Sequence, residues 1–381
     1  MKYLLINSVY GVKSTGKIVQ QQCHHLQKQG HTCLVAYGRE GVLDEKIPQL
    51  KIGSKIDQAY HMFLSRFFDR HGFASKLATR RFLKKVEDYQ PDVIWLHNLH
   101  GYYLHIGLLF RWLKEHPEIK VYWTLHDCWA FTGHCAYFTM ARCNAWQTLC
   151  QNCPQLQTYP KCFGKGRVRE NFLRKKALFT GVSQLTLITP SKWLADLTRQ
   201  SFLAEYPVKV VHNEIDRQVF KPTENQIKRQ YQILDKFLVL AMAIGLEATK
   251  GFIDMLKIRE LLDERFVIVL VGLTKEQIRL LPAGVIGLKR LDSTQALAQL
   301  YTAADVFVNP THQDNYPTVN LEAKACGTAV VTYDVGGSPE SVPKENVIAE
   351  HDYAAMAKRI REICEDEQRK RNGSNKFYCK N

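Results

Sequence analysis

Residues 305–327 read DVFVNPTHQDNYPTVNLEAKACG, a stretch in which an apolar run, a polar loop and a helical pattern follow one another directly. The run DVFVNP predicts a buried strand that ends at Pro310, and VNLEAKACG indicates the first turns of a helix. The loop THQDNYPT therefore lies at the carboxyl end of the strand. A strand, a loop and a helix in this order are typical of parallel-sheet α/β proteins.

The same alternation of apolar runs and helical segments continues along the whole chain. Earlier strands are predicted at KYLLIN, TCLVAYG, QPDVIWLHNLHG and KVYWTLHDCW, and the rhythm restarts with LTLITPSKWLADLTRQS, FLVLAMAIG, FVIVLVG, GVIGL and AVVTYDVGG. Short continuous apolar runs indicate parallel strands covered on both faces. We predict an α/β protein with two Rossmann-like doubly wound domains that face each other across a cleft, at residues 1–182 and 183–360. A C-terminal helix and tail follow at 361–381, and ligands are expected at the carboxyl ends of the strands.

Composition limits the possible functions. The 381 residues suit two domains, and no apolar run approaches the ~18–20 residues that a membrane span needs. The N-terminal MKYLLINSVYG predicts a first buried strand and not a signal peptide, so a cytoplasmic protein is expected. The net charge of +15 favours an anionic partner, namely nucleic acid, an anionic membrane surface or phosphorylated substrates, with solubility alone as the alternative. The eleven cysteines, an odd number, argue against a disulfide framework.

Two carboxylates, Asp314 and Glu322, stand eight residues apart on either side of the predicted helix start. The first amides of a helix have no internal acceptors and carry the positive end of its dipole, which suits phosphate. Glu322 lies a little over one turn into the helix, where it can accept hydrogen bonds from vicinal hydroxyls such as those of a ribose. The alternative is that both acids are ordinary capping and solvent residues.

Residues 304–340, ADVFVNPTHQDNYPTVNLEAKACGTAVVTYDVGGSPE, resemble the donor-binding signature of the retaining GT-B glycosyltransferases of family four. That family carries E-x(7)-E here, and this chain has Asp314-x(7)-Glu322. The resemblance implies that Glu322 holds the nucleotide ribose and that Asp314 lies beside the donor sugar in a catalytic role. It also implies that the segment from Asn315 through Thr318 to Val319 binds sugar and phosphate through its backbone amides. Asp in place of the first Glu retracts the charge by one methylene.

Other motifs extend the resemblance over nearly the whole chain. STGKIV, which contains Gly16, resembles the glycine-containing loop that faces the acceptor and the donor phosphate. WTLHDCWAFTGHC resembles the family's His-Asp strand end, which implies that His126 approaches the donor sugar. A buried core histidine is the alternative for His126. His97 and His100, in LHNLHG at a neighbouring strand end, are candidates for the acceptor pocket.

The second half of the chain shows both matches and departures. HNEIDRQVFKP resembles the family's Asn-Gly-Ile-Asp segment, with Glu214 in place of the glycine. AIGLEATKGF resembles the loop whose Arg and Lys neutralise the diphosphate. Lys250 matches the Lys, but no Arg stands at 244–249, so Arg290 or another cation is needed to replace it.

The resemblance implies retaining transfer of a hexosyl or related group from a nucleotide-sugar to a saccharide or lipid-linked saccharide, in surface polysaccharide synthesis such as that of lipopolysaccharide. Lys250 and the helix N-terminus stabilise the leaving group, so no metal or other cofactor is expected for catalysis. Two alternatives remain open. A nucleic-acid-binding protein is indicated by charge alone, without any compact nucleic-acid motif, so no nucleic acid is expected as a partner. A catalytically silent GT-B protein is indicated by Asp314 and the missing Arg.

Six cysteines crowd into a predicted Cys-rich excursion at residues 128–162 of the first domain. Four of them have the spacing C-x(7)-C-x(6)-C-x(2)-C, which suits one tetrahedral structural Zn²⁺: Cys135, Cys143, Cys150 and Cys153. A similar cysteine pattern occurs in some bacterial members of the family. Four separate thiols are the alternative, and the sequence predicts that the excursion has little apolar core of its own.

Two stretches combine aromatic and basic residues, FLSRFFDRHGFASKLATRRFLKK at 63–85 and KCFGKGRVRENFLRKK at 161–176. A basic amphipathic segment is typical of proteins that bind an anionic membrane surface. A solvated helix face is the alternative. We therefore expect peripheral association with the inner face of the cytoplasmic membrane.

Overall fold

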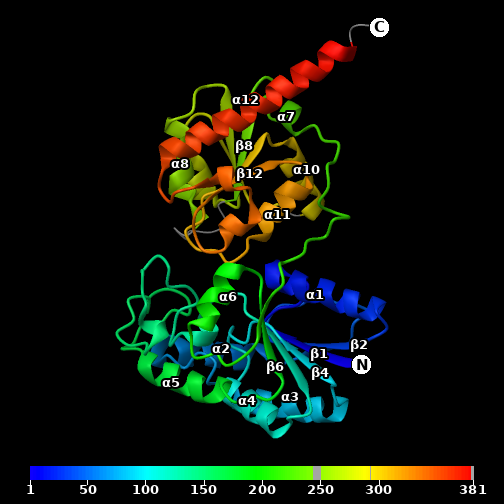
Figure 1. The fold of residues 1–381 in the computed structure, drawn as a ribbon, viewed down its shortest axis with the longest axis vertical. Coiled ribbons are helices and arrows are strands. Elements are labelled where there is room, and N and C mark those ends of the chain that lie inside the picture. Colours follow the sequence, from blue (N-terminus) through cyan, green and yellow to red (C-terminus); the bar gives the residue numbers. More distant parts are fainter. Residues whose placement is uncertain (243–249, 292, 379–381) are drawn as a thin grey trace. The chain divides into compact units, whose positions relative to one another are not determined.

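The computed structural model describes residues 1–242, 250–291 and 293–378. The chain divides into two compact units, Met1–Asn213 and Glu214–Asn381, which Figure 1 shows as a blue-to-green and a green-to-red body. Each unit contains one wholly parallel sheet. None of the helices in the described residues is both long and apolar enough to span a bilayer.

The first unit has a seven-stranded sheet of order β3-β2-β1-β4-β5-β6-β7. Its strands are β1 (Lys2–Asn7), β2 (Thr32–Tyr37), β3 (Gln49–Lys51), β4 (Val93–Leu96), β5 (Lys120–Thr124), β6 (Leu185–Thr189) and β7 (Val208–Val210). Its helices are α1 (Lys13–Lys28), α2 (Lys55–Phe68), α3 (Lys76–Tyr89), α4 (Ile106–Glu115), α5 (Val168–Phe179) and α6 (Lys192–Arg199). The strand order reverses between β1 and β4, which is the switch point of a doubly wound sheet.

The second unit has a six-stranded sheet of order β10-β9-β8-β11-β12-β13. Its strands are β8 (Phe237–Met242), β9 (Phe266–Val271), β10 (Val285–Leu288), β11 (Val306–Asn309), β12 (Ala329–Tyr333) and β13 (Val347–Ile348). Its helices are α7 (Ile227–Gln230), α8 (Phe252–Glu260), α9 (Lys275–Arg279), α10 (Thr294–Ala303), α11 (Thr318–Ala325) and α12 (Tyr353–Tyr378). Here the order reverses between β8 and β11.

The apolar runs of the sequence become strands that are buried on both faces. Along β1, Leu4 and Ile6 pack into one core cluster while Leu5 packs into another on the opposite face of the sheet. Along β8, Val239 and Leu240 separate in the same way. Successive side chains of a strand point to opposite faces, so two buried faces require an unbroken apolar run. The predicted α/β class with two doubly wound sheets is confirmed.

The boundaries between the parts differ from those predicted. β6 pairs with β5 and β7 pairs with β6, so residues 183–213 complete the first sheet and do not begin the second unit. The terminal helix begins at Tyr353, and Met356, Ile360 and Cys364 on it are buried in the second unit's core, so the predicted boundary at 361 falls inside this helix. The sequence rhythm is the same in both units, and it does not reveal which strands pair.

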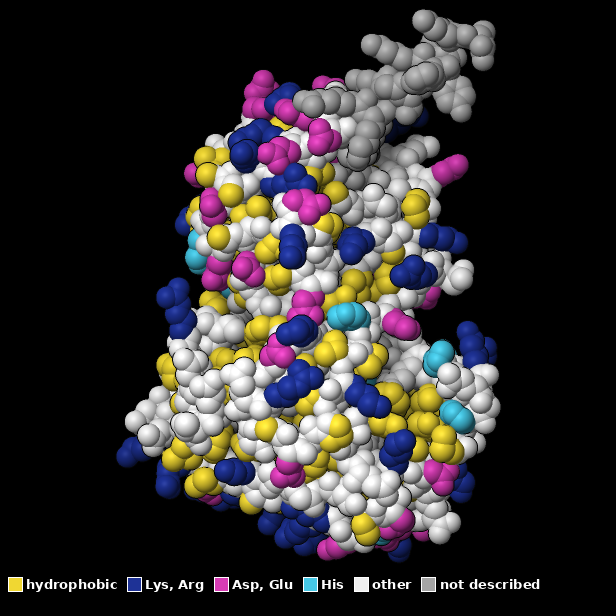
Figure 2. Space-filling view, viewed as in Figure 1, with side chains coloured by type: hydrophobic (Ala, Val, Ile, Leu, Met, Phe, Trp, Pro, Cys, Tyr) yellow, Lys and Arg dark blue, Asp and Glu magenta, His cyan; other side chains and the backbone are white. Residues whose placement is uncertain are grey.

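The excess positive charge lies in one unit. Residues 1–213 contain 29 Lys and Arg against 14 Asp and Glu, whereas residues 214–381 contain 23 of each kind. The whole net charge of +15 therefore belongs to the first unit. On the face drawn in Figure 2, acidic and basic side chains are intermingled over the second unit.

Candidate functional site

The β11–α11 loop, residues 310–317, leaves a strand in the middle of the second sheet and leads into α11. Asn309, at the end of β11, donates from Nδ2 to Asn320 Oδ1 at 2.9 Å, and Asn320 Nδ2 donates to Ser341 Oγ at 2.8 Å. These bonds tie the first turn of α11 to β11 and to the segment after β12. No side chain caps α11 in the described part of the chain, so the amides of its first turn suit an incoming anion.

The residues predicted to bind through their backbone lie where the sequence placed them. Asn315 is buried within the β11–α11 loop, Thr318 begins α11, and Val319 follows in its first turn, partly buried. Their position at a strand end and a helix start is confirmed. Their role in binding stays a prediction.

Lys250 and Asp314, identified from motifs 64 residues apart, form an ion pair with 2.9 Å between Nζ and Oδ2. The other oxygen of Asp314 accepts from the Asn315 amide at 2.9 Å. Gly251 makes this meeting possible because its φ is +72° and a Cβ there would lie 2.3 Å from the Pro310 carbonyl oxygen. The structure thus brings the predicted cation and the first acid together, each as the other's counter-ion.

Three positions concern the places where the second half of the chain departs from the family's motifs. Residues 244–249, where the missing Arg was sought, lie outside the described residues. Arg290, the suggested replacement, is exposed just beyond the carboxyl end of β10. Glu214, which stands in place of a glycine, is exposed at the start of the second unit.

Gly336, in the loop after β12, is a second point of close approach. Its φ is +60°, and a Cβ there would stand 2.0 Å from the Asp314 carbonyl oxygen, which also accepts from the Gly337 amide at 3.3 Å. Only glycine tolerates that conformation and that distance. The sequence analysis did not identify this residue, although the dipeptide GG at 336–337 is visible in the quoted motif.

Glu322 lies in the second turn of α11, as predicted. Its Oε2 accepts a hydrogen bond from the Tyr301 hydroxyl of α10 at 3.2 Å. Burial of Tyr301 raises its pKa well above the ordinary value, so it remains a neutral donor at physiological pH. Glu322 is therefore held in a defined orientation by a neighbouring helix.

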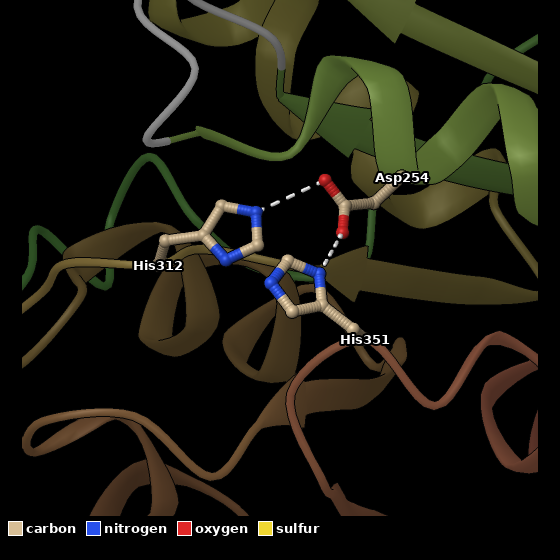
Figure 3. A group of neighbouring side chains, drawn as sticks. All are labelled: Asp254, His312 and His351. Atoms are coloured by element: carbon tan, nitrogen blue, oxygen red, sulfur yellow. Dashed lines mark hydrogen bonds and ion pairs between the residues drawn. The ribbon is translucent and has the colours of Figure 1, made fainter. Parts of the chain in front are cut away.

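A group of charged side chains that the sequence analysis missed fixes the start of the β11–α11 loop (Figure 3). His312 Nε2 lies 3.0 Å from Asp254 Oδ2, and His312 Nδ1 lies 2.6 Å from Glu350 Oε1. Asp254, on α8, also accepts from the Tyr333 hydroxyl at 3.1 Å and lies 3.3 Å from His351 Nδ1. His312 was present in the quoted stretch, but its partners come from segments 38 and 58 residues away.

This group is an ion-pair network. In the described chain, Asp254, His312 and His351 are the one set of three potential metal ligands whose ligand atoms lie within 4.8 Å of one another. However, both ring nitrogens of His312 face carboxylates, and the hydrogen bond to Asp254 raises the pKa of His312. Burial opposes ionisation of Asp254, but its hydrogen bonds outweigh that effect and lower its pKa. A buried imidazolium between two carboxylates is the state that these contacts favour.

We predict that His312→Gln destabilises the second unit by about 1.5–3 kcal/mol at pH 6. Because the folded-state pKa of His312 is raised, its pairing contributes fully below about pH 6.5 and is lost as the pH rises through the folded pKa. The difference from wild type should therefore shrink between pH 6 and pH 9. Urea unfolding followed by circular dichroism measures this difference. Tryptophan fluorescence would report on the first unit, because all six tryptophans lie there. An equal difference at both pH values would contradict the charged-histidine interpretation, and the exposed His25→Gln serves as the control.

In the first unit, the three predicted histidines meet at the carboxyl ends of β4 and β5. His97 Nδ1 lies 3.1 Å from His126 Nε2, and His100 Nε2 lies 2.8 Å from Asp127 Oδ2. All four residues line one hollow beside Trp129. Burial lowers the pKa of His126 to about 4 and that of His97 well below its ordinary value, so both rings are neutral at pH 7. The structure brings the three histidines together, and their contact with substrate stays a prediction.

Gly16 lies in the first turn of α1, under the loop that follows β1. A Cβ there would stand 3.2 Å from the Gly11 nitrogen, and Gly11 N–H donates to the Gly16 carbonyl at 3.0 Å. Gly16 therefore lets the loop close tightly on the helix start. Its predicted contact with the donor phosphate stays a prediction.

The four spaced cysteines line a single cavity of the Cys-rich excursion together with His134. The aromatic residues of this segment belong to the core cluster of the whole first unit, so the prediction that the segment has little core of its own stays a prediction. Phe131, Phe138 and Trp146 are buried there, with ring centroids 4.9 Å apart for Phe138 and Trp146 and 5.3 Å apart for Phe131 and Trp146. These three aromatic residues stand too far apart in sequence to form a recognisable pattern.

Both units match families of known proteins. Residues 15–219 match the family model described as Glycosyltransferase Family 4, and residues 223–377 match the model described as Glycosyl transferases group 1. The chain is 31% identical over 186 residues to the putative colanic acid biosynthesis glycosyl transferase WcaC of Escherichia coli K12. That match covers 47% of this chain and 44% of WcaC, so it spans less than half of that relative.

Solved structures resemble the chain over nearly its full length. Anabaena HepE in complex with UDP has a TM-score of 0.65 at 17% identity, and the match covers 97% of this chain and 91% of that one. WaaG, a glycosyltransferase involved in lipopolysaccharide biosynthesis, has a TM-score of 0.62 at 14% identity, with 95% and 90% covered. Two parallel α/β units and these neighbours define the GT-B fold class. The chain belongs to Glycosyltransferase Family 4.

Proposed function

We propose that this protein transfers a glycosyl group, with retention, from a nucleotide-sugar donor to a saccharide or lipid-linked saccharide acceptor in surface polysaccharide synthesis. The observation that carries the proposal is the Lys250–Asp314 pair in front of the uncapped start of α11, with Glu322 one turn further on. The UDP bound to HepE supports a nucleotide-sugar donor. The names of WcaC and WaaG support a role in polysaccharide synthesis.

The donor diphosphate takes the place of the Asp314 carboxylate as the partner of Lys250. The side chains of Lys250 and Asp314 are 36% and 20% exposed, so the pair is open to an incoming anion. As the bond from the anomeric carbon to the phosphate oxygen breaks, negative charge grows on the leaving group. Lys250 and the amides of the first turn of α11 stabilise that charge.

The ribose and the sugar are held by separate groups. Glu322, oriented by Tyr301, accepts hydrogen bonds from the vicinal ribose hydroxyls. Asp314, released from Lys250, faces the positive charge that develops on the sugar ring. The acceptor oxygen attacks from the side of the departing phosphate and passes its proton to a phosphate oxygen, so no enzyme nucleophile is required. His126 is neutral at pH 7, so it can exchange a hydrogen bond with a sugar hydroxyl without adding charge to the site.

Glu322→Gln tests the donor assignment. Replacing the carboxylate weakens two charge-assisted hydrogen bonds, each worth about 1.5–3 kcal/mol, so nucleotide-sugar affinity should fall about 10- to 100-fold. Isothermal titration with UDP-, GDP- and ADP-sugars measures the change. The exposed Glu345→Gln, in the same unit, is the matched control and should bind as wild type. Unchanged affinity in Glu322→Gln would remove the ribose assignment, and tight binding of duplex DNA in the same titration would favour the nucleic-acid alternative.

Lys250→Ala and Asp314→Asn should change nucleotide affinity in opposite directions. Removing Lys250 deletes the diphosphate's cation, so free nucleoside diphosphate binds more weakly and turnover falls. Removing the charge of Asp314 deletes the competing anion, so the nucleotide binds as tightly as in wild type or more tightly, while turnover still falls. Titration and initial-rate measurements on both variants separate these effects. Equal weakening of binding in both variants would contradict the exchange of partners at Lys250.

The two basic aromatic stretches come together in the first unit. Phe163 packs against Phe67 of α2 with 5.9 Å between ring centroids, and Phe63 packs against Phe67 at 4.9 Å. The Phe163 amide donates to the Arg66 carbonyl at 2.7 Å. Phe63, Phe67 and Phe163 are each about half exposed, at 50%, 51% and 51%. We propose that this aromatic patch inserts at an anionic membrane surface, supported by the net charge of its unit.

Vesicle co-sedimentation tests membrane binding. Vesicles that contain phosphatidylglycerol should retain the protein at low salt and release it at high salt, because each basic residue near the surface contributes about 1 kcal/mol. The double variant Phe63→Ser with Phe67→Ser should bind several-fold more weakly. Leu280→Ser, an exposed apolar change in the second unit, is the control. Equal binding to neutral phosphatidylcholine vesicles would contradict the electrostatic part of the proposal.

A further inference from the structure

One cavity in the Cys-rich excursion gathers five side chains that can take part in a metal centre. It is lined by Cys135, Cys143, Cys150 and Cys153 together with His134. Cys150 comes close to the segment that carries Cys135, because a Cβ on Gly133 would stand only 2.9 Å from Cys150 Cβ. Glycine at 133 is therefore needed for the two ends of the cysteine cluster to meet.

His134 carries the clearest sign of a missing partner. Its Nδ1 lies 2.7 Å from Asp69 Oδ1, and both side chains are buried. Its Nε2 is buried with no hydrogen-bond partner in the described structure, and the residue borders the cysteine cavity. A buried nitrogen without a hydrogen-bond partner is unfavourable, so an acceptor in the cavity would stabilise the folded unit.

Asp69 has a further role in placing this histidine. It ends α2 and also accepts from the Arg167 amide at 2.7 Å through its second oxygen. The carboxylate therefore fixes both the excursion and the start of α5 to one point. A carboxylate that orients a histidine beside a metal is a common second layer of metal sites.

Lys175, on α5, is buried against Thr132, which lines the same cavity. Its Nζ donates to the carbonyl oxygens of Trp129 at 2.7 Å and Thr132 at 3.1 Å, and the residue is 1% exposed. Among the described residues, no carboxylate oxygen lies within 4.0 Å of it. Burial lowers the pKa of Lys175 to about 7, and an anionic centre in the cavity would favour its charged form.

The sulfur atoms already show part of the required pattern. The Gln155 amide donates to Cys153 Sγ at 3.4 Å. No three of the sulfurs lie within 4.8 Å of one another, because the described residues contain one such ligand set and it is in the second unit. A tetrahedral site with Zn–S bonds of 2.3 Å needs sulfurs about 3.8 Å apart. The cysteine side chains must therefore close around the ion.

We propose that Cys135, Cys143, Cys150 and Cys153 hold one structural Zn²⁺ as thiolates, with the buried side chains of His134 and Lys175 beside it. Four thiolates and one Zn²⁺ carry a net charge of −2, which favours the charged form of the buried Lys175 near the cavity. His134, held by Asp69, donates from Nε2 to a zinc-bound sulfur. The site is closed, with no open coordination position, and takes no part in sugar transfer.

The metal content of the full-length protein tests the ligand set. Protein made without a His tag and purified without chelator should contain about one zinc per chain by plasma mass spectrometry. Cys143→Ser and Cys150→Ser should each lose most of it. Cys326→Ser, a buried cysteine of the second unit, is the matched control and should keep it. Wild-type protein without metal would overturn the proposal, and so would iron in place of zinc.

Two further measurements keep the proposal testable if a variant fails to fold. Chelation of wild-type zinc should lower the unfolding temperature of the first unit, followed by tryptophan fluorescence, and added zinc should restore it. Thiol titration in denaturant should find eleven free thiols, and two fewer would indicate a disulfide and overturn the site.

The role of His134 has its own test. After replacement of zinc by Co²⁺, the absorption of four thiolate ligands should be the same in wild type and in His134→Gln. The variant should bind metal about 10- to 100-fold more weakly, as expected when a second-layer partner is lost. A changed ligand spectrum in His134→Gln would overturn the assignment of four cysteines and make the histidine a ligand.

Discussion

Two backbone carbonyl groups in the β11–α11 loop, those of Pro310 and Asp314, are each approached by a glycine from another loop. Gly251 and Gly336 both have positive φ, and a Cβ on either one would overlap the carbonyl oxygen. These approaches bring the start of α8 and the loop after β12 against the same few residues. The meeting of Lys250 with Asp314 depends on this close packing, because a side chain at Gly251 would push the cation away.

Buried ion pairs then hold together the segments that this close backbone packing brings into contact. The buried imidazole of His312 joins α8, through Asp254, to the β11–α11 loop and to Glu350. In the β11–α11 loop, His312 stands shortly before Asp314. Buried charges therefore hold the start of the loop, and the next part of the loop carries the exchangeable Lys250–Asp314 pair. Such a division suits a site that must stay ordered before its anionic ligand arrives.

The first unit contains a different set of buried polar groups. Its strand ends carry histidines that burial keeps neutral. The buried Lys175 of α5 donates to two carbonyls of the Cys-rich excursion, and His134 of the excursion pairs with the buried Asp69. Buried polar groups need partners, and the excursion supplies backbone carbonyls for Lys175 but none for His134 Nε2. The excess positive charge of the unit is carried mainly on its surface, where it favours an anionic partner.

The sequence by itself determined the α/β class, the two parallel sheets, and the placement of Asp314, Glu322 and Lys250 at a strand end and helix start. Each of these depends on local patterns, since an apolar run or a strand-loop-helix order is visible within about ten residues. Tertiary structure alone decided which strands complete the first sheet, that Lys250 pairs with Asp314, and that His312 is clamped between two carboxylates. These outcomes depend on distances between segments that are tens of residues apart in the chain, and spacing along a sequence does not encode such distances.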